Sequence, residues 1–255
     1  MNLTRSLSFE VNRTCDLGHL HPACPNLHPD RFRYSKSKIP LSNDIIFEFW
    51  KWCKEKHGFR GILNMSNYSE PTLAINRIRI IMSRIKEVDP LQPFQLVTNR
   101  EDGDYEKEFD IVKRSRYRNL IRLCDDGKPD MDNRVLCNIG EGSPYSSQPP
   151  FGHCVRGLGW ELIIGFHGEW HLCCADWTCE ESVGSICIDD WDALYYRWKE
   201  KARRIKWSNE GEYNALPRLC RSCLDINPSL HFREDVDLIR RLPPQKHKDW
   251  GTDLL

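Results

Sequence analysis

The sequence predicts an α/β protein with a parallel sheet, followed by a small cysteine-rich domain built on a β-hairpin and a helix. In the first 125 residues, short segments with apolar residues at every second position alternate with longer segments whose apolar residues recur at three and four. Strands separated by helices of this length form βαβ units and a parallel sheet. After residue 153 the chain is instead rich in cysteine and tryptophan.

The first predicted strand spans residues 6–12 and is expected to be half-buried, because apolar and polar residues alternate along it. Its buried face would carry Leu7, Phe9 and Val11, and its polar face Ser8, Glu10 and Asn12. Further strands are expected in the segments GILNM, FQLVTN, RNLIRLC and RVLCNI, and the segment WELIIGFHGEWHLCC predicts a hairpin that turns at HGE.

Four helices are expected, at 41–58, 72–88, 104–115 and 189–205. Capping candidates Ser42, Asn43 and Asp44 stand at the start of the first helix, and Gly58 ends it. The third of these helices is short, and the second has the clearest amphipathic pattern.

The composition excludes several classes of function. The chain has 255 residues with 37 basic and 37 acidic side chains, which does not indicate a general binder of nucleic acids or membrane surfaces. The longest apolar run, ELIIGF, is too short to span a bilayer, and no secretory segment is evident, so a cytoplasmic protein is expected. Twelve cysteines in a reducing compartment indicate metal binding or catalysis.

A loop rich in cysteine and histidine follows the first predicted strand. In parallel sheets, functional groups gather in the loops after the carboxyl ends of strands, and the segments SNYSEP and TNRED occupy the same position after later strands. The first loop is therefore either a polar connection or a metal or cluster site, and its candidate ligands are Cys15, His19, His21, Cys24 and His28.

The last two-fifths of the chain contain a second set of candidate ligands. Cys220 and Cys223 form a CxxC turn that lets two thiolates bind one centre, and the hairpin can bring Cys173 back beside Cys154. Four thiolates suit a tetrahedral zinc or a fully ligated 4Fe–4S cluster. Cys174 is expected to point away, Cys179 and Cys187 are either further ligands or core residues, and the tryptophans are expected to pack in the core or to line a site.

These back-end residues resemble the SPASM/Twitch auxiliary-cluster domain of radical S-adenosylmethionine (radical SAM) enzymes. That domain has a Cys, nine to fifteen residues, a Gly, four residues, a Cys, a helix and a terminal CxxC, which match Cys154, Gly168, Cys173, the helix through Trp198, Cys220 and Cys223. No cysteine follows the CxxC, so the match is to the shorter Twitch form. The resemblance implies a partial (βα) barrel at 1–140, shortened here, a linker at 141–153, the auxiliary domain at 154–235 and a tail at 236–255.

The front half carries the same resemblance. Ser69, Glu70 and Pro71 match the end of the GGEP motif, which binds the amino group of S-adenosylmethionine, while Thr98 and Asn99 resemble the family's TNG strand ending. The resemblance therefore implies S-adenosylmethionine and 4Fe–4S clusters as cofactors, an electron donor such as flavodoxin or ferredoxin, and a peptide, protein or small-molecule substrate. Specific nucleic acids and membranes are not expected as partners.

The front loop departs from the family's CxxxCxxC motif. His19 stands where the second cysteine is expected, and Leu27 lies three residues beyond Cys24, so only two thiols are present. Either a histidine (His19, His21 or His28) or a distant cysteine completes the site with Cys15 and Cys24, since histidine ligates iron in Rieske centres, or the radical-generating cluster has been lost. The sequence thus supports a radical SAM enzyme, a catalytically degenerate binding protein with the same ancestry, or an unrelated zinc protein.

Overall fold

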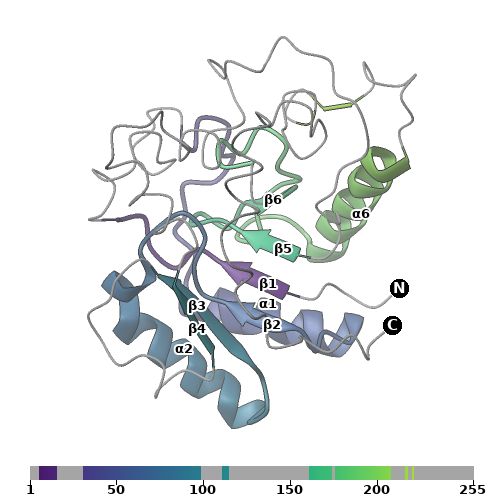
Figure 1. The fold of residues 1–255 in the computed structure, drawn as a ribbon. Coiled ribbons are helices and arrows are strands. Elements are labelled where there is room, and N and C mark those ends of the chain that lie inside the picture. Colours follow the sequence, from purple (N-terminus) through teal and green to yellow (C-terminus); the bar gives the residue numbers. More distant parts are fainter. Residues whose placement is uncertain are drawn as a thin grey trace, which may run out of the picture.

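The computed structural model describes residues 6–15, 31–98, 111–114, 161–173, 176–207, 216–217 and 220. Within these ranges, six strands form one sheet in the order β4-β3-β2-β1-β5-β6 (Figure 1). The pairs β1–β2, β2–β3, β3–β4 and β1–β5 are parallel, and β5–β6 is antiparallel. The strands are β1 (Ser6–Phe9), β2 (Ile62–Asn64), β3 (Phe94–Thr98), β4 (Ile111–Arg114), β5 (Glu161–Ile164) and β6 (Trp170–His171). The predicted α/β fold with a parallel sheet is confirmed.

Helix α1 (Asn43–His57) links β1 to β2 and ends where its sequence predicts. The Ser42 hydroxyl accepts the Ile45 N–H at 3.1 Å, which satisfies one of the free donors of the first turn. Gly58 adopts a left-handed conformation with φ 66° and caps the carboxyl end.

A 3₁₀ turn, η2 (Pro71–Ala74), and helix α2 (Ile75–Val88) link β2 to β3. Helix α2 buries Ile78, Ile81, Met82 and Ile85 on one face, as its period predicts. It packs beside α1, where the Arg77 Nε donates to Asn43 Oδ1 at 2.8 Å.

The fourth strand was expected at RNLIRLC, with a short helix at 104–115 before it. The helix prediction is wrong at its carboxyl end, because Ile111–Arg114 pairs in parallel with β3 from Gln95 to Thr98. Isoleucine and valine begin this segment, and β-branched residues favour strands, so pairing with an open sheet edge decided the outcome over the helical pattern. The segments RNLIRLC and RVLCNI lie outside the described residues.

Strand β1 is buried on both faces, which corrects the half-buried strand expected from its alternation. Ser8 and Glu10 are 0% exposed, as are Leu7 and Phe9. On the polar face, the Ser8 hydroxyl donates to Glu161 Oε1 at 2.5 Å and Glu10 pairs with Arg31, so distant parts of the chain cover it. Strand β5 also pairs with the free edge of β1, from Ser6 opposite Glu161 to Phe9 opposite Ile164. The β1 strand is therefore central in the sheet.

The hairpin expected at HGE is present as β5 and β6. Gly168 turns the chain with φ 77°, and its N–H donates to the Gly165 carbonyl at 3.0 Å. In Figure 1, β5 lies between β1 and β6, and helix α6 (Trp191–Trp207) lies at that end of the sheet. The expected domain boundaries near 140 and 153 fall outside the described residues.

Aromatic side chains pack α1 against the hairpin and α6. The Trp170 ring meets Phe49 edge-on with centroids 5.3 Å apart, and it lies 5.9 Å from Trp198. Phe49 also meets Trp191 at 5.3 Å. These tryptophans therefore form core rather than a site lining. No helix in the described part of the chain is long and apolar enough to cross a membrane.

Candidate functional site at the carboxyl edge of the sheet

Glu70 lies buried where the loops after β2 and β3 meet. Its carboxylate oxygen Oε1 accepts from the Thr98 hydroxyl at 2.5 Å and from the Thr72 hydroxyl at 2.8 Å. The Thr72 N–H donates to the same oxygen at 3.2 Å, so Glu70 caps the 3₁₀ turn η2. Glu70 and Thr98 are 3% and 2% exposed. Two residues that the sequence predicted for one site are thus in direct contact.

The backbone of Glu70 ties this site to the loop that follows β1. Its N–H donates to the Thr14 carbonyl at 3.0 Å, and its carbonyl accepts from the Asn12 side-chain amide at 2.7 Å. Thr14 directly precedes Cys15, which is half-buried. The first candidate cluster ligand and the SEP segment therefore share one backbone network.

Ser69 and Pro71 flank Glu70 and are both buried. Pro71 opens η2, where its missing N–H costs nothing because the first turn has free donors. The Ser69 hydroxyl is buried and has no hydrogen-bond partner among the described residues. A buried hydroxyl without a partner costs free energy, so this oxygen is suited to meet a polar group of a ligand.

The other predicted ligands are only partly described. Cys15 and Cys173 are half-buried, and Cys220 is buried. His19, His21, Cys24, His28, Asn99, Cys154 and Cys223 lie outside the described residues. The predicted front and back cluster sites therefore stay predictions.

A buried ion pair that the sequence analysis missed stands beside the site. Glu10 follows β1 and pairs with Arg31, whose guanidinium lies over the Tyr68 ring at 5.8 Å. Glu10 Oε2 and Arg31 Nε are buried and have no partner in the part of the chain that the structure describes. No local pattern indicates this pair, since alternation placed Glu10 on a polar face.

Three further buried residues gather on and beside the β5–β6 hairpin: Glu169, His171 and Cys179. Cys179 was considered a spare ligand or a core residue, but Glu169 and His171 were missed. Their spacing of two along a predicted strand was the available signal, because it puts both side chains on one face. Burial, together with the charges of Glu169 and Asp176, raises the pKa of the Cys179 thiol far above its ordinary value of 9.0.

Asp176 shapes the loop that brings Cys179 to the hairpin. It is 0% exposed, and its carboxylate accepts the N–H groups of Glu181 at 3.1 Å and Leu172 at 3.4 Å. Burial raises the pKa of Asp176 from 3.8 to about 6, while the nearby His171 and these N–H groups oppose the shift.

Comparisons with known proteins identify the fold. No known family profile and no curated protein sequence matches the chain. Two solved structures match: BtrN in complex with AdoMet and 2-DOIA, with 16% identity and a TM-score of 0.54, and selenomethionine BtrN in an open conformation, with 14% identity and a TM-score of 0.55. The matches cover 87% of this chain and 93% and 92% of the BtrN chains. At these identities the likeness shows the fold alone, a mixed α/β fold with a largely parallel sheet like that of BtrN.

Proposed function

We propose that the chain is a radical SAM enzyme that cleaves S-adenosylmethionine and abstracts hydrogen from a peptide, protein or small-molecule substrate. The observation that carries the proposal is Glu70, which lies at the carboxyl edge of the sheet in the segment that resembles the family's amine-binding motif. The fold adds support, because BtrN, which has a similar fold, was crystallised with AdoMet.

The described residues fit the amino group of S-adenosylmethionine. A buried carboxylate attracts an ammonium group strongly, because the surroundings screen the charges little. Thr72 and Thr98 fix Oε1 of Glu70 from two sides, so the side chain is oriented before a ligand arrives. The Ser69 hydroxyl, which has no partner in the described ranges, would supply a second polar contact beside Glu70.

The clusters supply the chemistry that the protein side chains lack. When bound, a reduced 4Fe–4S cluster provides the electron that cleaves S-adenosylmethionine to methionine and a 5′-deoxyadenosyl radical, which removes a hydrogen atom from the substrate. Cys15 and Cys24, with His19 or His28, would hold the front cluster. Cys154, Cys173, Cys220 and Cys223 would hold an auxiliary cluster that is structural or passes electrons from a donor such as flavodoxin or ferredoxin.

The remaining task of the chain is to position the cofactor and to exclude water. Glu70 and Thr98 are almost fully buried, and the Asn12 and Thr14 contacts hold the first residues of the front loop against Glu70. A cluster held through Cys15 would therefore lie close to the Glu70 carboxylate, as a ligand bound by both would require. Burial also protects a radical from solvent.

The first test is the metal content of protein purified without oxygen. About eight irons per chain with matching sulfide indicate two 4Fe–4S clusters and support the enzyme. About four irons support a degenerate protein that keeps only the back cluster, and zinc without sulfide supports an unrelated zinc protein. Formation of 5′-deoxyadenosine under a strong reductant then tests activity, and an eight-iron protein that never forms it refutes the proposal.

Ser69→Ala separates ligand binding from folding. Because the Ser69 oxygen has no partner among the described residues, its removal should leave the unfolding midpoint unchanged or slightly raised. S-adenosylmethionine binding should nevertheless weaken several-fold. Glu70→Gln should abolish 5′-deoxyadenosine formation, and Glu48→Gln, on the exposed face of α1, is the matched control. Unchanged binding in Ser69→Ala would count against the assigned contact.

A further inference from the structure

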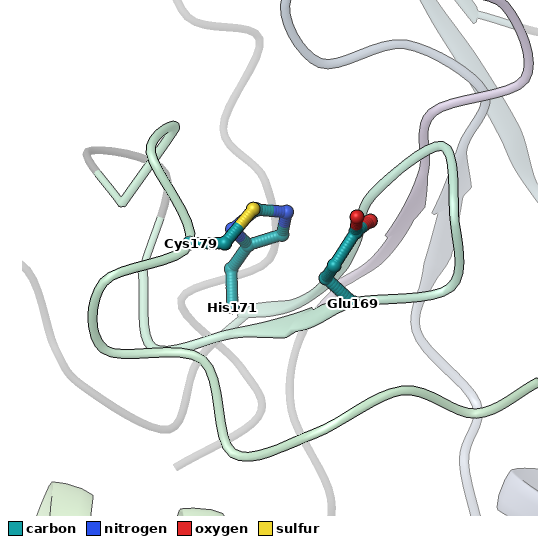
Figure 2. Close-up of side chains that lie close together, drawn as sticks. All are labelled: Glu169, His171 and Cys179. Atoms are coloured by element: carbon teal, nitrogen blue, oxygen red, sulfur yellow. The ribbon is translucent and has the colours of Figure 1, made fainter. Parts of the chain in front are cut away.

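Glu169, His171 and Cys179 bring one ligand atom each to a single buried point. Figure 2 shows the three side chains converging. Glu169 and His171 lie two residues apart on the hairpin, and Cys179 comes from the loop that follows it. The carboxylate oxygen, imidazole nitrogen and thiol sulfur all lie within 4.8 Å of one another. The residues are only 1%, 1% and 2% exposed.

His171 is arranged as a metal-ligating histidine is. Its Nδ1 lies 2.6 Å from the Asp176 carbonyl oxygen, which can only accept, so Nδ1 carries the proton. With the proton on Nδ1, the lone pair of a neutral ring is on Nε2, and this buried atom has no partner among the described residues. Metal-bound histidines commonly donate their second ring N–H to a backbone carbonyl in this way, which orients the ring.

Glu169 is also held in place by neighbouring hydrogen-bond donors. It accepts from the Ser35 hydroxyl, from the His167 N–H at 3.0 Å and from the His167 ring nitrogen Nδ1 at 3.2 Å. No lysine or arginine among residues the structure describes forms an ion pair with it. These hydrogen bonds fix the carboxylate, but a buried negative charge is stabilised further by a cation.

The backbone leaves room for a bound group and holds Cys179 beside it. A Cβ added to Gly165 would lie 2.4 Å from His171 Nε2 and 2.6 Å from Glu169 Oε2, so both ligand atoms meet over this glycine. Cys179 has φ 65°, a left-handed conformation that is unfavourable for a non-glycine residue. Such strain is maintained where the surrounding structure requires the side chain in one place.

We propose that Glu169, His171 and Cys179 bind one divalent transition-metal ion, with zinc as the best match. Carboxylate, neutral imidazole and thiolate are all zinc ligands, and one carboxylate plus one thiolate balance a charge of two. Ligand atoms around a tetrahedral zinc stand about 3.4 Å apart, from bonds of about 2.0–2.3 Å. Small side-chain movements therefore complete the site from separations within 4.8 Å.

This site is separate from the predicted cluster ligands and does not depend on the proposed function. Three protein ligands leave the fourth position of a tetrahedral zinc for water or another small oxygen ligand. The bound ion would also replace the thiol proton of Cys179 and fasten its loop to the hairpin beside β1.

The test uses the full chain in two arms. In the first arm, zinc per chain is measured by atomic emission in the natural sequence and in Gly165→Ala, whose added methyl group occupies the space of two ligand atoms without straining φ. In the second arm, cobalt(II) is titrated into a background with Cys15, Cys24, Cys220 and Cys223 all changed to Ser. Cys187→Ser is the matched control, since Cys187 is a half-buried cysteine outside the trio.

The expected result is the loss of one zinc per chain in Gly165→Ala and no loss in Cys187→Ser. In the background chain, one equivalent of cobalt should give a thiolate-to-cobalt charge-transfer band, which Cys179→Ser should abolish. Zinc retained in full by Gly165→Ala, or a background chain with native circular dichroism that binds no cobalt, would overturn the proposal. Neither readout depends on cleavage of S-adenosylmethionine, so the two proposals fail independently.

Discussion

The buried pair between Glu10 and Arg31 predicts a large, strongly coupled loss of stability when either side chain is replaced. The two side chains are 1% and 5% exposed, and they join the end of β1 to the segment before α1. Arg31→Met keeps most of the side-chain volume but leaves the Glu10 carboxylate buried without its cation. Glu10→Leu in turn leaves the Arg31 guanidinium buried without its anion.

The magnitude follows from burial. Removal of one partner of a buried ion pair costs about 3–5 kcal/mol, because the remaining charge stays out of water uncompensated. Glu10 Oε2 and Arg31 Nε lack partners within the described ranges. The attraction between the two charges therefore offsets only part of the free energy that their removal from water costs. The double variant Glu10→Leu/Arg31→Met should therefore recover most of the loss, with a coupling of about 3 kcal/mol between the two sites.

Urea unfolding followed by tryptophan fluorescence measures all four members of this double-mutant cycle at pH 7. For a chain of this size, each single variant should also lower the melting temperature by about 10 °C. Single losses below about 1 kcal/mol would show that the side chains reach water despite their burial. Losses that simply add in the double variant would show that no charge pairing stabilises the fold, and either result refutes the reasoning.

Three further predictions concern the scaffold. Trp170→Ala should cost about 3–5 kcal/mol in urea unfolding, because its fully buried ring joins the aromatic cluster; a loss below 2 kcal/mol would contradict that packing. Ser42→Ala should cost about 1 kcal/mol through the lost cap of α1, and Ser42→Asp should restore it. The hydrogen bond from Lys54 lowers the pKa of Asp89 below 3.8. Its contribution, at most about 1 kcal/mol, is therefore complete above pH 4 and lost as pH falls through the lowered pKa, and Asp89→Asn should remove this pH dependence in thermal melts.

Local signals predicted local structure well. The first helix begins after Ser42 and ends before Gly58, as predicted. Caps can be predicted from sequence because each is a contact between residues three or four apart. The β4 segment was predicted as helix because its strand pairing is with β3, outside its own window. Likewise, the buried Glu10 side chain pairs with Arg31 on a separate segment, and β5 pairs with β1 from more than 150 positions away. Alternation within one segment cannot reveal a partner on its other side.

The candidate sites divide in the same way. The contact between Glu70 and Thr98 was predictable, since Glu70 lies in the loop after β2, Thr98 ends β3, and adjacent parallel strands end at one edge. The trio of Glu169, His171 and Cys179 needed the turn of the hairpin and the conformation of the Asp176 loop. The spacing of Glu169 and His171 predicts that they share one face of a strand, but it does not predict that Cys179 lies beside them.

The parallel pairing of β5 with β1 explains why several polar groups meet at one edge. If β1 were an edge strand, the loop after it would face the SEP segment on one side and solvent on the other. With β5 in place, the Glu10 N–H donates to the Ile164 carbonyl at 2.9 Å, and the Gly165 turn follows directly. The same strand thus fixes the loop that carries Cys15 and the hairpin that carries Glu169 and His171. Because both depend on one pairing, changes that loosen β5 should weaken both sites, whereas Ser69→Ala and Gly165→Ala should each affect only one.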